Sequence, residues 1–198
     1  MQKFLIIILT SVLVSCGDAP LPKPYGYFRV ALPQHAYRQL GDTLGVLYTF
    51  DLPVYTQLTR ADAEKAAQAD RATDGEQWIN INYPQLGATI YCYYKPLQNN
   101  LYEISEEVRK MVYKHSVRAD AIGEQRYEDT DNRVFGVFYD LKGNTASTAQ
   151  FVLTDSVHHF FRAAVYFNNV PNSDSIAPVR NFVNEDILRM METFKWKH

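Results

Sequence analysis

Cysteine is scarce in this sequence, with 2 among 198 residues, and tryptophan is equally rare. A small exported domain built on disulfides needs more cysteine, so an ordinary hydrophobic core must hold this fold. An excess of positive charge is also missing, because 20 basic side chains stand against 22 acidic ones. We therefore expect no nucleic-acid partner, since neutralising phosphates requires a clustered Lys and Arg surface.

Motifs of established catalytic or metal-binding chemistry are missing as well. The sequence contains no HExxH or CxxC pair, no Gly-x-Ser-x-Gly elbow, no Walker A loop and no dinucleotide fingerprint. His115 is remote in sequence from His158 and His159, and neighbours in a strand point to opposite faces, so these histidines do not predict a shared metal. We expect no catalytic residue, no metal and no cofactor. An enzyme assembled from scattered residues stays an open alternative.

The N-terminal segment carries the most specific motif of the chain. Lys3 precedes an apolar run at 4–14, which is too short to cross a bilayer as a mature helix. The run ends in Leu-Val-Ser-Cys, which resembles a bacterial lipobox and implies that Cys16 is acylated after cleavage. The alternative is an ordinary secretory signal with an incidental cysteine. We expect a signal peptide at 1–16, a Pro-rich tether at 17–24 and one domain at 25–198.

Cys92 is the second cysteine, and acylation of Cys16 leaves it without a partner in the chain. It lies in an apolar strand pattern. A buried, inert thiol is therefore favoured over a reactive one.

Three apolar runs at 134–141, 147–153 and 160–167 form the centre of the sequence pattern. They are rich in β-branched and aromatic residues, and Gly-Asn and Asp-Ser breaks separate them. Such breaks are typical of tight hairpin turns. The pattern predicts a three-stranded antiparallel meander.

Helical and extended segments surround the meander. Apolar residues recur at helical spacing at 99–117 and 175–194, and the second helix has Pro178 in its expected first turn. The alanine-rich stretch at 60–72 predicts a surface insertion without catalytic residues, as a helix that is either exposed or only partly formed. Extended segments are predicted at 25–32, 44–50, 54–58, 78–83 and 89–94. The expected fold class is α+β, an antiparallel β-sheet covered by two main amphipathic helices, with a topology that resembles the PsbP-like fold.

Several stretches resemble the gliding motility lipoprotein family GldD. They include 113–122, 142–147 and 150–156, together with the strings YGYFRV, YPQLGATIYCYYKP, RAAVYFN and ETFKWK. The resemblance implies a lipid-anchored envelope protein, palmitate-modified and facing the periplasm, with the outer membrane favoured over the inner. It also implies a role in gliding and in the linked type IX secretion machinery, without a known catalytic activity.

Two classes of function follow from this resemblance and from the tyrosine-rich sheet. The first is a non-enzymatic assembly or interaction component that contacts other gliding or secretion proteins of the envelope. The second is a periplasmic glycan- or lipid-binding module or hydrolase. Loops on a rigid scaffold commonly carry recognition, although tight turns prefer the same residues. The predicted interaction surface comprises Lys114, Arg118, Lys142, Asn144, Ser147, Thr154, Asp155 and His158.

Overall fold

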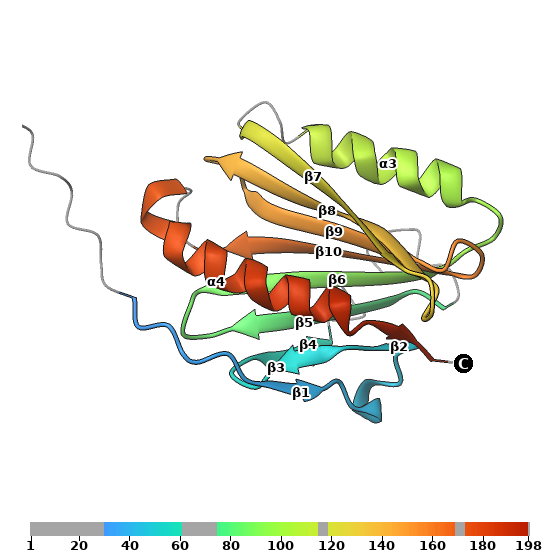
Figure 1. Cartoon of the computed structure of the whole chain (residues 1–198), viewed down its shortest axis with the longest axis horizontal. Coiled ribbons are helices and arrows are strands. Elements are labelled where there is room, and N and C mark those ends of the chain that lie inside the picture. The colour runs from blue at the N-terminus through green and yellow to red at the C-terminus, as the bar shows by residue number, and fades with distance from the viewer. Residues whose placement is uncertain (1–29, 61–74, 115–118, 169–172, 198) are drawn as a thin grey trace, which may run out of the picture.

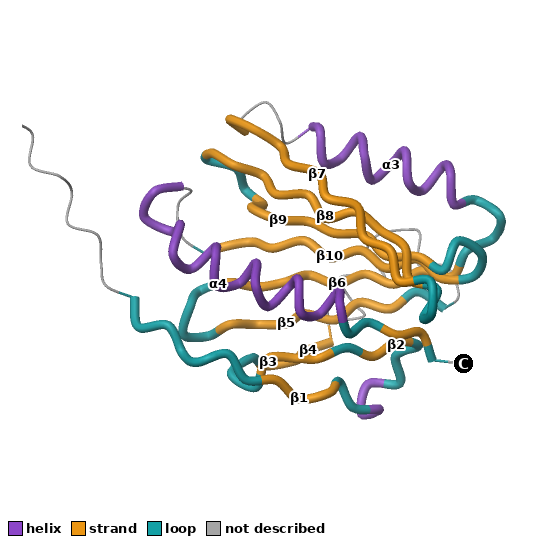
Figure 2. The backbone as a smooth tube through the Cα atoms, in the orientation of Figure 1, coloured by secondary structure: helices purple, strands orange, loops and turns teal. Residues whose placement is uncertain are grey.

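A seven-stranded antiparallel sheet dominates the computed structural model, which describes residues 30–60, 75–114, 119–168 and 173–197. Figures 1 and 2 show its strands running side by side across the molecule. Two small two-stranded sheets pair β1 with β3 and β2 with β11. In spatial order, the large sheet contains β4 (Gln57–Arg60), β5 (Gln77–Tyr83), β6 (Ala88–Pro96), β10 (His159–Phe167), β9 (Ser147–Thr154), β8 (Val134–Gly143) and β7 (Ala119–Asp129).

The predicted meander is confirmed as β8, β9 and β10 at the centre of this sheet. Its turns place Gly143 and Ser156 at positive φ, 103° and 71°. A β-carbon at Gly136 would lie 2.0 Å from the Val152 carbonyl oxygen. This position therefore has room only for glycine, because the neighbouring strand passes directly beside it.

The larger core lies between one face of the sheet and α4 (Ser173–Glu192). Pro178 lies inside this helix and not in its first turn, because α4 begins earlier than its apolar stripe indicated. Burial of this many apolar side chains is the main driving force for the fold. The core side chains include Val183, Ile187 and Met190 of α4, Ile81, Ile90, Phe151 and Phe161 of the sheet, and Tyr48, Phe50 and Phe194.

A second, smaller core lies on the other face of the sheet, under α3 (Leu101–Lys114). Ile104, Val108 and Val112 are the buried residues of α3 in this core. Alternation along β9 shows that the two helices use opposite faces, because Phe151 belongs to the core under α4 and its neighbour Val152 contacts the core under α3. Sheet residues under α3 come from β7, β8, β9 and β10. Among the described residues, none comes from β4, β5 or β6.

The expected α+β class, with two main helices covering the sheet in a PsbP-like manner, is wrong. The described chain is mostly β-sheet, and its two α-helices lie on opposite faces of the sheet. An apolar stripe reveals that a helix buries one side, but it carries no information about which face of the sheet the helix covers. The helical spacing therefore predicted two helices without predicting that one sheet face stays partly open.

β7 is the strand that the sequence pattern missed. Its eleven residues are mainly polar, and it pairs only with β8 at the edge of the sheet. An edge strand needs few apolar side chains, because backbone hydrogen bonds to one neighbour hold it.

The N-terminal strands also differ from the prediction. Residues 30–32 are not in a strand, and β1 is Tyr37–Gln39. The predicted segment at 44–50 contains only β2 (Tyr48–Thr49), after a 3-10 helix at Asp42–Leu44. β3 (Asp51–Pro53) ends in a turn, so the segment at 54–58 starts as that turn. The predictions for residues 25–29 and for nearly all of the alanine-rich stretch lie outside the described residues. At the other end of the described chain, β11 (Lys195–Trp196) pairs with β2.

Candidate functional site

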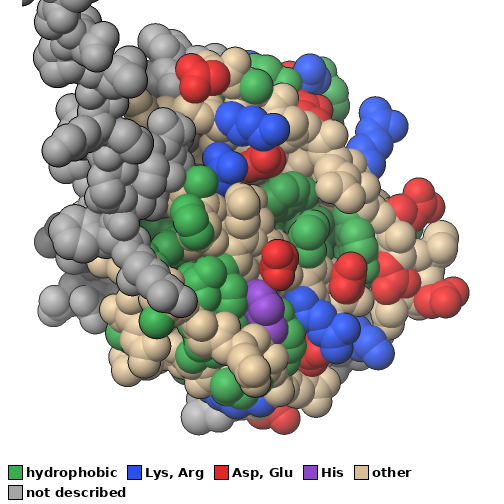
Figure 3. Space-filling model, turned by 60° about the vertical axis from the view of Figure 1, so that its left-hand side comes forward, with side chains coloured by type: hydrophobic (Ala, Val, Ile, Leu, Met, Phe, Trp, Pro, Cys, Tyr) green, Lys and Arg blue, Asp and Glu red, His purple; other side chains and the backbone are tan. Residues whose placement is uncertain are grey.

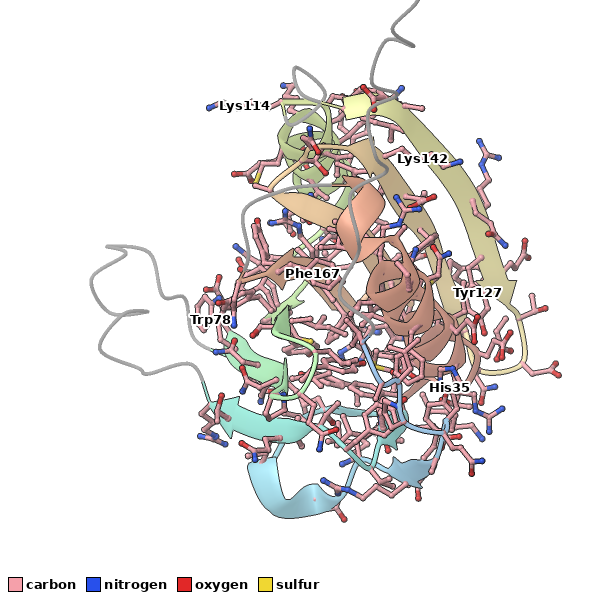
Figure 4. The ribbon with its side chains drawn as sticks, turned by 90° about the vertical axis from the view of Figure 1, so that its left-hand side faces the viewer. His35, Trp78, Lys114, Tyr127, Lys142 and Phe167 are labelled. Carbon is pink, nitrogen blue, oxygen red and sulfur yellow. The ribbon has the colours of Figure 1, made fainter. Side chains whose placement is uncertain are left out.

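The residues of the predicted interaction surface lie at two opposite ends of the sheet. Lys114 ends α3 and Lys142 lies near the end of β8, and Figure 4 shows them at the same end of the sheet with their side chains on opposite sides. Thr154 ends β9, so Thr154, Asp155 and His158 lie at the other end, about 25 Å away for a strand of this length. Arg118 lies outside the described residues. The structure therefore places the lysines at one end of the sheet, on opposite sides of it, and separates both from the second turn.

The lysine end is made of exposed side chains beside one buried hydroxyl. Lys114, Lys142 and Asn144 are exposed, and neither lysine forms an ion pair with a described carboxylate. Ser147 is 0% exposed, and its hydroxyl donates to the Ala149 carbonyl at 3.2 Å. In Figure 3, where this end is turned forward, basic and acidic side chains are interspersed. The lysines are thus available to a partner, whereas Ser147 supports the turn.

Asp155 organises the turn at the opposite end. Its Oδ1 accepts hydrogen bonds from the backbone N–H groups of Val157, His158 and His159 at 3.0, 2.7 and 2.8 Å. Burial alone would raise the pKa of Asp155, but these N–H donors outweigh burial and hold the pKa below its usual value. Thr154 also bridges the turn, because its hydroxyl donates to the His159 carbonyl at 2.7 Å. The geometry gives Thr154 and Asp155 a structural role in this hairpin.

An open aromatic face occupies the part of the sheet that α3 leaves uncovered. It consists of the outward side chains of β5, β6 and β10, among them Trp78, Tyr91, Tyr93 and Tyr166. Trp78 and Tyr93 form one cross-strand pair at 5.0 Å, and Tyr91 and Tyr166 form a second at 5.5 Å. Tyr91 is 50% exposed. These rings cover the sheet but remain accessible to a ligand.

A cavity of about 450 Å³ lies in this open face, lined by Tyr91, Arg162, Ala164 and Tyr166. Arg162 donates to Gln150 Oε1 at 2.8 Å and lies 3.7 Å from the Met111 sulfur. Its Nε and the Gln150 Nε2 are buried and have no hydrogen-bond partner among the described residues. Burial lowers the pKa of Arg162. The cavity therefore has apolar walls and a cationic, donor-rich floor.

A buried carboxylate network joins the N-terminal segment to α4 on the other side of the molecule. Asp186 is 0% exposed and accepts hydrogen bonds from the hydroxyls of Tyr37 and Tyr55, each at 2.8 Å. His35 Nδ1 lies 2.9 Å from Asp186 Oδ1, and its Nε2 lies 3.0 Å from Glu185. Burial, followed by the hydrogen bond to Asp186, raises the pKa of both tyrosines, so they remain donors. The network holds 30–55 against the helix.

Three further observations concern chemistry and membranes. Cys92 is confirmed as buried, and burial raises the pKa of its thiol. Within the described ranges, no group of three or more His, Cys, Asp or Glu side chains is placed to hold a metal ion. No helix in that part of the chain is both long and apolar enough to cross a membrane.

Comparison with known families decides what kind of protein this is. The family model for gliding motility lipoprotein GldD matches residues 17–196. The chain belongs to the GldD family. A search of curated proteins finds no match. The resemblance found in the sequence is therefore confirmed, over nearly the whole chain after Cys16.

Membership of the GldD family gives the chain a role in gliding motility and membrane anchoring in the cell envelope as a lipoprotein. All the geometry described above falls within the matched residues, including both ends of the sheet, the open aromatic face and the Asp186 network. Cys16 is adjacent to the matched range but outside the described residues, so its acylation stays a prediction.

Sequence reasoning missed two of these features. His35 and Asp186 are 151 positions apart, and neither belongs to a motif. Arg162 is the one charged residue in the otherwise apolar strand sequence RAAVYF. A single charge in such a pattern is the sequence feature that could have identified it. Such a residue needs a partner when it is buried, and that requirement would have drawn attention to it.

Proposed function

We propose that this GldD-family chain is a lipid-anchored, non-enzymatic interaction component of the gliding machinery and of the linked type IX secretion machinery. Its predicted anchor is the acylated Cys16, and the folded domain faces the periplasm, with the outer membrane favoured. Two or three acyl chains hold a protein stably, because each buried CH₂ contributes about 0.8 kcal/mol.

The observation that carries this proposal is the pair of exposed lysines at one end of the sheet. Lys114 and Lys142 come from different elements and present their side chains on opposite sides of this end, as Figure 4 shows. Neither ammonium group forms an ion pair with a described carboxylate, although Lys114 also complements the C-terminal end of α3. Cations presented on a rigid scaffold provide electrostatic complementarity to an acidic patch on a partner.

The alternative function is a periplasmic glycan- or lipid-binding module or hydrolase. The cavity in the open aromatic face favours ligand binding in particular, because it combines apolar walls with a few convergent polar groups. A binding role at this face is compatible with docking through the lysine end, since the two surfaces are distinct.

Charge reversal at the lysine end tests the proposal. Lys142→Glu and Lys114→Glu should each cost at most about 0.5 kcal/mol of stability, because both side chains are exposed. Like-charge contacts should nevertheless weaken docking, and we expect roughly a fivefold or greater loss of envelope proteins that co-purify with the full-length lipoprotein. The measurement is quantitative mass spectrometry of affinity-purified complexes at equal abundance of the bait.

Arg38→Glu is the matched control. Arg38 is also exposed, but it lies in β1 and outside the predicted interaction surface. The control should retain its partners. Equal retention by all three variants would place the docking surface elsewhere and contradict this part of the proposal.

A further inference from the structure

We propose that the cavity in the open aromatic face binds a sugar ring that carries a carboxylate. The proposal goes beyond docking through the lysine end and rests on different residues. It uses the shape of the cavity, the charge at its floor and the polar groups that the fold leaves without partners.

The size and walls of the cavity fit a saccharide. A volume of about 450 Å³ lies in the range of small-ligand sites and accommodates one or two hexose rings. Tyr91 and Tyr166 flank Ala164, whose small side chain leaves room between them. Aromatic side chains with a polar tip suit a sugar, because the ring packs against its C–H face and the hydroxyl reaches its oxygens.

The floor of the cavity determines the charge of the ligand. Arg162 lines the cavity, is largely buried and forms no ion pair with a described carboxylate. A cation removed from water requires a counter-charge or a full set of acceptors; the fold gives this guanidinium one good acceptor, Gln150 Oε1, and the Glu107 carboxylate acts on it without forming an ion pair. A planar carboxylate matches the guanidinium fork in two parallel hydrogen bonds.

The unpartnered polar groups agree with an acceptor-rich ligand. Gln150 is 1% exposed and pairs across the strands with Ala164, so its amide lies beside the cavity. Its Nε2 and the Arg162 Nε are both N–H donors, and both lack a described partner. The Thr148 hydroxyl, on the same face of β9, lacks a described partner as well. Buried donors of this kind are normally satisfied, and a ligand with carboxylate and hydroxyl oxygens satisfies them once the Arg162 and Gln150 side chains turn toward the cavity.

The test compares two sugars that differ mainly by one carboxylate. Binding of N-acetylmuramic acid and of N-acetylglucosamine to the full-length lipoprotein in detergent is measured by isothermal titration calorimetry, and glucuronic acid supplies a second acidic ring. We expect the acidic sugars to bind about tenfold or more tightly than the neutral one, as loss of a charge-assisted pair implies. A preference between the two acidic sugars distinguishes a cell-wall source from an exopolysaccharide source.

Matched variants assign the binding to this cavity. Arg162→Gln and Tyr91→Ala should each weaken acidic-sugar binding about tenfold. Arg126→Gln on the edge strand β7 and Tyr102→Ala on α3 should leave it unchanged, since both residues are exposed and lie outside the cavity. Thermal unfolding checks each variant, and Tyr91→Ala keeps the test valid if Arg162→Gln fails to fold.

Three results would overturn the proposal. The first is no saturable binding of any acidic sugar. The second is equal binding of acidic and neutral sugars, or equal effects of the cavity and control variants. The third is full competition by inorganic phosphate alone with no gain from the sugar ring, which would define a simple anion site. Lys142 does not line the cavity, so these sugar-binding results are independent of the Lys142→Glu experiment. The docking proposal is therefore tested separately.

Discussion

Among single residues, Asp186 is a buried carboxylate on which polar contacts from distant parts of the chain converge. Two tyrosine hydroxyls donate to its carboxylate, and His35 Nδ1 lies within hydrogen-bond distance. His35 also stacks on Phe182 of α4 at 4.1 Å. A buried carboxylate costs free energy unless it is fully hydrogen-bonded, so these contacts explain how Asp186 remains inside the protein. The network fastens the N-terminal segment and is assigned no catalytic role.

Replacing this carboxylate should destabilise the fold strongly. Asp186→Asn keeps the shape but turns one acceptor into a donor facing tyrosine hydroxyls, and we expect a loss of about 2–4 kcal/mol. Glu185→Gln is the control, because Glu185 contacts the same histidine from an exposed position and should cost about 0.5 kcal/mol or less. Urea unfolding of both variants measures the difference. Similar losses would show that the network is not what holds the segment.

Individual residues also show why the sequence predicted only part of the candidate site. Gly143 and Asp155 serve their turns as their residue types indicate, and both turns were predicted. The Asp186 network and the Arg162 cavity depend on which residues the sheet brings together across long sequence separations. No local spacing encodes such contacts, so they emerged only from the fold.

Among the elements, β8 and β9 approach each other closely at Gly136. A β-carbon at Gly136 would meet the Val152 carbonyl at 2.0 Å and a Leu153 methyl at 2.7 Å. Because one of these atoms belongs to the backbone, the strands would have to separate to relieve the overlap.

Gly136→Ala should therefore destabilise the domain by about 3 kcal/mol, which lowers the Tm by roughly 6–12 °C for a protein of this size. Gly123→Ala on β7 is the comparison, because the atom nearest to its new β-carbon would be 3.8 Å away. That variant should change the Tm by no more than about 3 °C. Differential scanning calorimetry distinguishes the two, and a small shift for Gly136→Ala would mean that β8 and β9 are less closely apposed than described.

Strong periodicity made the central elements predictable. The meander, β5, β6 and both helices were located because each buries at least one regular face. β7 and the short N-terminal strands were missed because tertiary pairing, and not their own composition, holds them in place. Periodicity shows which side of a helix is buried, but not which face of the sheet the helix packs against. The placement of the two helices on opposite faces therefore could not be predicted from it.

At the scale of the whole molecule, the sheet carries distinct surfaces. The lysine end holds exposed cations, the open aromatic face holds the cavity, and α4 with the N-terminal segment covers the opposite face. Figure 4 shows Trp78 of the open face and His35 of the covered face on opposite sides. Under the two proposals above, the lysine end contacts partner proteins and the open aromatic face binds a carboxylated sugar.

Release from the membrane is the most direct test of the proposal that the chain works as an anchored interaction component. Cys16→Ser, placed behind a signal peptide that is cleaved without lipid attachment, should yield a folded, soluble periplasmic protein at normal abundance. We expect gliding to be lost, because docking at the membrane then depends on the lysine end alone and the effective concentration falls. Gliding speed and envelope fractionation are measured on the same cells. Full gliding with the released protein would contradict the account, since a diffusible enzyme would still reach its substrate.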